Sequence, residues 1–236
     1  MAIEGANATL LSANRSVEVF IEKIDSNVNK FVSSASEKEF MFELNDQFEV
    51  EWIYENPMKF GIFLEIAIKL LGVRPESEKF SIDSSSFFEN GTKIGIGSSS
   101  AISVAITRAM NKYFDLNLDN QKILFASLEI HNHFQNYTGS GLDVLSSFYS
   151  FPVIECSKSK DNSYKWSQLN IPDEIKITFV KGSASADTHE MIKRYFSGKL
   201  EHQKFFLEIS KEMRESLKEL SKAFKENKSL MILNAI

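Results

Sequence analysis

A glycine- and serine-rich run in the middle of the chain constrains the fold most, because it joins a strand-like segment to a helical one. The run, called here the glycine loop, is Lys93-Ile94-Gly95-Ile96-Gly97-Ser98-Ser99-Ser100-Ala101. Residues 80–88 before it have the composition of a strand, and residues 98–114 repeat apolar side chains at the helical period. The sequence therefore predicts a strand, a tight loop and a helix in succession.

Other segments show the same alternation of strand-like and helix-like patterns. The expected elements are a strand or strand pair, a half-buried strand and two helices, in residues 9–20, 40–52, 57–72 and 121–133. Gly72 and Pro75 mark the end of the first of these helices. The alternation favours a mixed α/β or α+β fold over an all-α or all-β one.

The C-terminal third begins with a polar run over residues 157–173, which is the predicted domain boundary. We expect an N-terminal domain over residues 1–165 and a C-terminal domain over residues 171–236. A short strand is expected at Ile175–Val180. Residues 204–225 repeat apolar side chains every three or four positions among many charges, which predicts a helix packed by one apolar stripe on the second domain's core.

Composition excludes several classes of partner. Lysine and arginine number 27 against 32 aspartates and glutamates, so the formal net charge is −5 and no global positive field favours nucleic acid or an anionic membrane. The single cysteine, Cys156, allows no internal disulfide, and the N-terminus has no export signal, so we expect a cytoplasmic protein. The most apolar stretch, residues 60–73, is too short to cross a bilayer.

The glycine loop has the chemistry of a phosphate cradle. Two glycines let the backbone approach an anion closely, the serines add hydroxyl groups, and the first turn of a helix presents N–H groups without helical partners. It is neither a Walker loop, which ends in Gly-Lys-Ser/Thr, nor a Rossmann loop, which has a third glycine. The alternative is an ordinary helix start, since serine and glycine both favour N-caps.

A second motif follows the helix predicted at residues 121–133. Gly139 and Gly141 form a flexible turn, and Asp143 comes where a helix could begin, so its carboxylate is either an N-cap or a site carboxylate. His131 and His133 are two residues apart and point in different directions on a helix, which makes them a poor metal pair. We interpret them as packing or hydrogen-bonding residues.

Together the two motifs resemble those of the GHMP kinase superfamily of small-molecule kinases. Its ATP-binding loop has the form Gly-Leu-Gly-Ser-Ser-Ala, which is similar to the stretch from Gly95 to Ala101. The second motif looks most like the phosphomevalonate kinase branch, where a histidine, a glutamine four residues later and Gly-Ser-Gly-x-Asp-Val follow one another. The matching residues are His131, Gln135, Gly139, Ser140, Gly141, Asp143 and Val144.

The resemblance implies a GHMP kinase-like two-domain α+β fold. Its N-terminal domain would be ribosomal-protein-S5-domain-2-like and its C-terminal domain an incomplete ferredoxin-like one. It also implies transfer of the ATP γ-phosphoryl group, with Mg²⁺, to (R)-5-phosphomevalonate, giving 5-diphosphomevalonate in the mevalonate pathway of isoprenoid biosynthesis. The expected partner is thus a small phosphorylated substrate, with no nucleic acid and no membrane.

The same resemblance assigns roles to individual residues. Asp143 would orient or deprotonate the acceptor oxygen, and Ser99 would be a ligand of Mg²⁺. The nucleotide-binding residues would be Lys93, Gly95, Ile96, Gly97, Ser98, Ser99 and Ser100. The substrate-binding residues would be Ser140, Gly141, Lys181, Ser183, Ser185 and Thr188.

Departures from the family pattern keep alternatives open. The chain contains no Pro-Gly-Lys motif and no third glycine-rich motif, so a truncated or degenerate nucleotide-binding remnant without activity is one alternative. Mevalonate kinase is another, but its magnesium-binding glutamate corresponds to Asn132, and an amide is a weaker ligand for a hard cation. Homoserine kinase and galactokinase match the second motif less well. A structural protein that keeps only the fold has no positive sequence feature.

Overall fold

The structure is a computed structural model that describes residues 6–36, 38–159, 163–178, 180 and 188–235. Contacts divide the chain into two compact units. The central unit runs from Asn14 to Tyr137, and the terminal unit combines the residues up to Ala13 with those from Thr138 onward. The domain limits predicted from the polar run, 1–165 and 171–236, stay a prediction.

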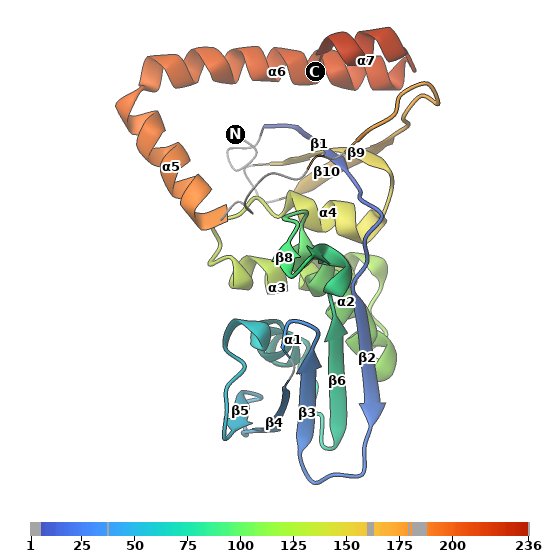
Figure 1. Ribbon diagram of the computed structural model, residues 1–236, viewed down its shortest axis with the longest axis vertical. Helices are drawn as coiled ribbons and strands as arrows, with labels where there is room; N and C mark the ends of the chain where they lie inside the picture. Colours follow the sequence, from blue (N-terminus) through green and yellow to red (C-terminus); the bar gives the residue numbers. More distant parts are fainter. Residues whose placement is uncertain (1–5, 37, 160–162, 179, 181–187, 236) are drawn as a thin grey trace. The chain divides into compact units, whose positions relative to one another are not determined.

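The central unit is built on a five-stranded sheet with the order β2-β6-β3-β4-β5 (Figure 1). The strands are β2 (Glu18–Lys23), β3 (Asn29–Ser33), β4 (Glu39–Leu44), β5 (Val50–Ile53) and β6 (Glu78–Asp83). All neighbours are antiparallel except β3 and β6, which are parallel with Phe31 opposite Phe80. Both phenylalanines are fully buried, so this central pair carries the apolar face of the sheet.

The single strand predicted over residues 40–52 is wrong, because a tight turn divides it into β4 and β5. In that turn the side chain of Asn45 accepts hydrogen bonds from the backbone N–H groups of Gln47 and Glu49, at 2.9 and 3.0 Å. Phe48 has a φ of 61°. An Asx-type turn of this kind reverses the chain and sets up the antiparallel hairpin.

Three helices contribute to the core of the central unit. They are α1 (Ile62–Leu71), α2 (Ser98–Tyr113) and α3 (Asn120–Phe134), and all three were predicted. Gly72, with a φ of 63°, ends α1 in the left-handed conformation that glycine adopts without strain. Fully buried side chains from sheet and helices form one cluster, which includes Phe31, Phe42, Phe80, Leu64, Ile68, Ile106, Met110 and Ile130.

Short elements lead from the sheet to the glycine loop. The strand predicted at residues 80–88 ends earlier, and the 3₁₀ helix η3 (Ser85–Phe87) follows β6. The hairpin of β7 (Phe88–Glu89) and β8 (Thr92–Lys93) comes next and runs directly into the loop. A second 3₁₀ helix, η2 (Met58–Phe60), precedes α1.

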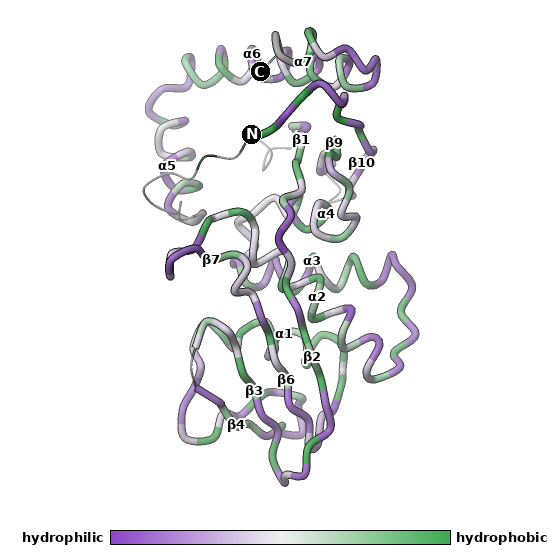
Figure 2. Tube along the Cα trace, turned by 45° about the vertical axis from the view of Figure 1, so that its right-hand side comes forward, coloured by the Kyte–Doolittle hydropathy of each residue, from purple (hydrophilic) through white to green (hydrophobic). Residues whose placement is uncertain are grey.

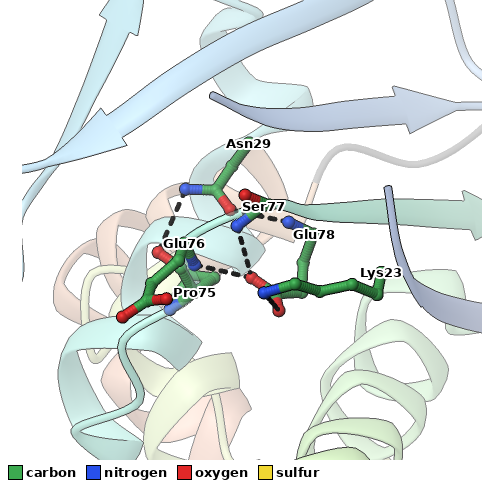
Figure 3. Close-up of polar contacts among 6 residues, drawn as sticks. All are labelled: Lys23, Asn29, Pro75, Glu76, Ser77 and Glu78. Atoms are coloured by element: carbon green, nitrogen blue, oxygen red, sulfur yellow. Dashed lines mark hydrogen bonds and ion pairs between the residues drawn. The ribbon is translucent and has the colours of Figure 1, made fainter. Parts of the chain in front are cut away.

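A buried polar cluster links β3 to the chain before β6 (Figure 3). The side chain of Asn29 donates to the carbonyl oxygen of Pro75 at 3.1 Å and accepts from the backbone N–H of Glu78 at 3.0 Å. The Glu78 carboxylate accepts from the N–H groups of Glu76 and Ser77, at 2.6 and 2.9 Å. Asn29, Pro75 and Glu78 are buried, so the two Asn29 bonds satisfy backbone groups that lie away from water.

Asn29→Ala is expected to lower the free energy of unfolding by about 2 to 4 kcal/mol, because it leaves a buried N–H and a buried carbonyl without partners. Urea denaturation followed by tryptophan fluorescence measures the loss. The matched control is Asn45→Ala, which removes four side-chain bonds, all in a solvent-accessible turn, and is expected to cost about 1 kcal/mol or less because water can replace them. Equal losses in the two variants would contradict the role given to the buried cluster.

The terminal unit contains a three-stranded antiparallel sheet with the order β1-β9-β10. Its strands are β1 (Ala8–Leu11), β9 (Val153–Lys158) and β10 (Tyr164–Leu169). Its helices are α4 (Leu142–Tyr149), α5 (Thr188–Glu201), α6 (Gln203–Lys225) and α7 (Ser229–Ala235). Val153, Leu169, Ala223, Phe224 and Ile232 form its buried cluster.

The short strand predicted at Ile175–Val180 is wrong for the residues described there. Residues 175–178 and 180 have no strand structure, because a turn precedes them in which the N–H of Ile175 donates to the carbonyl oxygen of Pro172 at 2.9 Å. The Ile175 side chain packs against the buried cluster instead.

Helix α6 is confirmed, and Figure 2 shows apolar and polar residues alternating along it. The expected packing holds only at its C-terminal end, where Leu220 and Phe224 contact the buried cluster. Farther along the stripe, Phe205 and Met213 are 58% and 49% exposed. No helix in the described part of the chain is long and apolar enough to span a membrane.

Candidate functional site

The glycine loop connects β8 to α2 and takes a backbone shape that two glycines make possible. Gly95 and Gly97 have φ values of 85° and 86°, in the left-handed region that other residues rarely adopt. Gly97 is the N-cap of α2, and its carbonyl oxygen accepts the first helical bond from Ala101 at 3.2 Å. A Cβ atom added at Gly97 would lie 3.2 Å from the hydroxyl oxygen of Ser100. Close backbone approach to a ligand and helix start thus coincide at one residue.

The three serines of the loop have different environments. Ser98 and Ser100 are buried, and the Ser100 hydroxyl donates to the carbonyl oxygen of Gly97 at 2.7 Å. Ser99 is partly exposed, and its own carbonyl oxygen accepts from the Ser103 hydroxyl at 2.9 Å. Ser99 is therefore the serine whose hydroxyl is best placed to meet a ligand.

A histidine from α3 lies behind the Ser99 hydroxyl. His131 is fully buried, and its Nε2 atom is 3.3 Å from the Ser99 Oγ atom and 3.2 Å from the Gln135 Nε2 atom. His131 and Gln135 are four residues apart, so the end of α3 brings them to one face. The sequence predicted hydrogen bonding for His131 but not this contact with the loop, and the four-residue spacing of His131 and Gln135 was the only available signal.

Lys93, at the end of β8, is the cation of the loop. Its side chain is solvent-accessible, yet partial desolvation lowers its pKa from the ordinary value, and the charge of Lys59 lowers the pKa further. Its neighbour Ile94 is held by a backbone bond from its N–H to the carbonyl oxygen of Phe87, at 2.9 Å. Because water stabilises the charge of this lysine only in part, a nearby anion would stabilise that charge more than it would the charge of a fully solvated lysine.

In the terminal unit, Asp143 lies in the first turn of α4. The N-cap is Gly141, with a φ of 73° and no side-chain capping bond, so of the two roles that the sequence left open for Asp143 the helix cap is excluded. The reason is that the glycine turn already starts the helix, since the Val144 N–H donates to the Gly141 carbonyl oxygen at 3.2 Å. Asp143 is partly buried and lies in the first turn of the helix, at the positive end of its dipole.

The residues around Asp143 are held by further bonds within the terminal unit. The Ser140 hydroxyl accepts from the Leu142 N–H at 3.4 Å, and the Tyr164 hydroxyl donates to the Ser140 carbonyl oxygen at 3.2 Å. Buried Cys156 has a pKa raised to about 12, by desolvation first and then by the charges of Glu155 and Asp143. Its thiol therefore stays protonated and is no nucleophile.

The remaining predicted substrate residues are only partly covered by the structure. Lys181, Ser183 and Ser185 lie outside the described residues. Thr188 is the first residue of α5. Their predicted roles, like those of the other site residues, stay predictions.

The residues of the glycine loop are better suited to bind Mg²⁺ that is already bound to a nucleotide than to bind a free metal ion. Within the described residues, no group of three or more His, Cys, Asp or Glu side chains could hold a metal. Mg²⁺ bound with a nucleotide takes most of its oxygens from phosphates and water and needs only one or two from the protein. The Ser99 hydroxyl can supply one of these oxygens.

A family model matches the stretch of chain that contains the candidate site residues. Residues 64–151 match the family model described as GHMP kinases N terminal domain. This range includes the glycine loop, His131 and Asp143. No curated protein matches the chain significantly.

The chain is also similar to several solved structures. The Lin0012 protein of Listeria innocua has a TM-score of 0.78 at 19% identity, over 100% of this chain and 71% of that one. The phosphomevalonate kinase of Streptococcus pneumoniae, in complex with phosphomevalonate and AMPPNP, has a TM-score of 0.70 at 15% identity, over 99% and 72%. The L. major mevalonate kinase has a TM-score of 0.65 at 14% identity, over 99% and 67%. The predicted mixed α+β, GHMP kinase-like fold is confirmed.

Proposed function

We propose that the chain transfers the γ-phosphoryl group of ATP to a small phosphorylated molecule, and that residues 64–151, which match the GHMP kinase N-terminal domain model, bind the nucleotide. The observation that carries the proposal is the glycine loop. Two glycines with positive φ precede the first turn of α2. This arrangement combines close backbone approach with first-turn N–H groups that a helix does not bond internally, and with the Ser99 hydroxyl.

We propose (R)-5-phosphomevalonate as the acceptor. The support is the spacing of His131, Gln135 and the stretch from Gly139 to Val144, which resembles the phosphomevalonate kinase branch. A solved phosphomevalonate kinase complex shares the fold over 99% of this chain. Asn132 replaces the glutamate expected of a mevalonate kinase, which disfavours that acceptor.

The proposed chemistry needs positioning and charge neutralisation more than covalent catalysis. Backbone N–H groups between Gly95 and Ser99 bind the ATP phosphates, and Lys93 adds a positive charge near them. Mg²⁺, held in part by the Ser99 hydroxyl, would neutralise charge on the transferred phosphoryl group.

Asp143 orients the acceptor oxygen in this proposal. The 5-phosphate of the acceptor is already ionised near neutral pH, so no strong base is required to activate it. The carboxylate acts chiefly through geometry and electrostatics. This role keeps Asp143 in the reaction even though it does not cap α4.

The acceptor is tested by measuring kcat/KM with MgATP and each of 5-phosphomevalonate, mevalonate and homoserine. ADP release gives the rate, and mass spectrometry identifies the product. We expect 5-phosphomevalonate to be preferred over mevalonate by about 100-fold or more, because a site built for a phosphate loses its charged bonds with an acceptor that lacks one. Faster turnover of mevalonate or homoserine would reject this acceptor. Nucleotide binding without turnover of any acceptor would instead support an inactive remnant.

A further inference from the structure

His131 lies directly behind Ser99, the partly exposed serine of the glycine loop. Its ring is fully buried, although burying a polar ring costs free energy unless the ring makes hydrogen bonds. One ring atom, Nε2, is near both Ser99 Oγ, at 3.3 Å, and Gln135 Nε2, at 3.2 Å. This one nitrogen thus contacts both a side chain at the start of α2 and a side chain at the end of α3.

The hydrogen-bonding groups at this nitrogen determine which way the Ser99 hydroxyl points. In the amide orientation of this structure, Gln135 Nε2 faces the ring and donates, so His131 Nε2 accepts and the ring hydrogen is on Nδ1. An accepting Nε2 can form a bond with the Ser99 hydroxyl only if that hydroxyl donates. The hydrogen of Ser99 is then directed at His131, and the oxygen lone pairs remain for a ligand.

This orientation distinguishes a cation ligand from an anion ligand. A hydroxyl that has given its hydrogen to a ring nitrogen can offer lone pairs to Mg²⁺ but cannot donate to a phosphate oxygen. We propose that His131 and Gln135 are positioning residues that fix Ser99 as a cation ligand. The inference rests on the proposed binding of a magnesium nucleotide at the glycine loop and specifies how this chain's residues receive the metal.

Nitrogen NMR tests the tautomer without any nucleotide. The chain has four histidines, so a His131→Gln sample identifies the His131 signals by their loss. We expect Nε2 of His131 to show the shift of an unprotonated ring nitrogen and Nδ1 that of a protonated one. A hydrogen on Nε2 would overturn the inference whatever the protein's function.

Calorimetric titration with AMPPNP, in Mg²⁺ and in EDTA, tests the consequence. In the wild type we expect Mg²⁺ to tighten AMPPNP binding. His131→Phe keeps a ring but removes the acceptor, and we expect the gain from Mg²⁺ to fall about tenfold or more, as in Ser99→Ala, while affinity in EDTA stays within about threefold. His131→Gln places an amide oxygen near the former Nε2 position and is expected to restore part of the gain.

Two further variants complete the design. The double variant Ser99→Ala with His131→Phe should lose no more than Ser99→Ala alone, because both remove the same oriented hydroxyl. His133→Phe, an exposed position on the same helix, should leave the gain from Mg²⁺ unchanged. A His131→Phe protein with the full gain from Mg²⁺, or with equal losses in Mg²⁺ and EDTA, would overturn the inference. A wild type that binds no AMPPNP would reject the proposed function, and the NMR result would still decide the tautomer.

Discussion

Gly97→Val is expected to weaken binding of MgATP by about 100-fold or more. The φ of Gly97 is 86°, where a β-branched residue is strained by about 1 to 3 kcal/mol, and an added Cβ would come within 3.2 Å of Ser100 Oγ. The valine methyl groups would also fill the space that the phosphates need to approach the backbone. Calorimetric titration measures the dissociation constant, and circular dichroism establishes that the variant is folded.

Gly91→Val is the matched control for this substitution. Gly91 also has a positive φ, 72°, but nothing lies within 4 Å of an added Cβ, and it belongs to the β7–β8 turn before the loop. The control carries the backbone strain without blocking the loop, so its affinity for MgATP should stay near that of the wild type. A folded Gly97→Val protein with unchanged affinity would mean that the phosphates do not bind at this loop.

Asp143→Asn is expected to lower kcat by about two orders of magnitude, the usual size of an electrostatic or general-base contribution. The melting temperature should change little, because Gly141 and not Asp143 caps α4, so only a dipole interaction of about 0.3 to 1 kcal/mol is lost. Affinity for MgATP should persist. Steady-state kinetics, thermal melting and calorimetry separate these three effects.

The control for this variant is an aspartate that does cap a helix. Asp119 is the N-cap of α3, and its side chain accepts from the Lys122 N–H at 2.8 Å. Asp119→Asn keeps most of that capping ability and is expected to leave kcat unchanged. If Asp143→Asn retained nearly full turnover, Asp143 would have no part in the proposed mechanism.

Local sequence signals predicted the elements around the loop well. Helix α1 ends at Gly72 and helix α2 begins directly after Gly97. Both boundaries were predictable because a glycine, which adopts positive φ easily, affects only the helix turn next to it. The β4–β5 hairpin was missed for the opposite reason. Its apolar alternation continues across the turn, and only the side-chain bonds of Asn45 show where the chain reverses.

The sequence named individual residues for the candidate site but did not predict which of them contact one another. The contact between Ser99 and His131 joins positions 32 residues apart, and such a contact depends on how α2 and α3 pack. The sequence could not exclude a cap at Asp143, because glycine can begin a helix without a side-chain bond, as Gly141 does. The types of side chain limited the chemistry that the site could perform, and the packing of α2 and α3 determined which side chains contact one another.

The central claim is that the glycine loop binds the phosphates of ATP, and amide chemical-shift mapping tests it most directly. Titrating MgATP into the ¹⁵N-labelled chain should shift the amide signals between Gly95 and Ala101 most strongly, together with the signal of His131 behind Ser99. MgATP that binds with its largest shifts elsewhere, or that does not bind at all, would contradict the account.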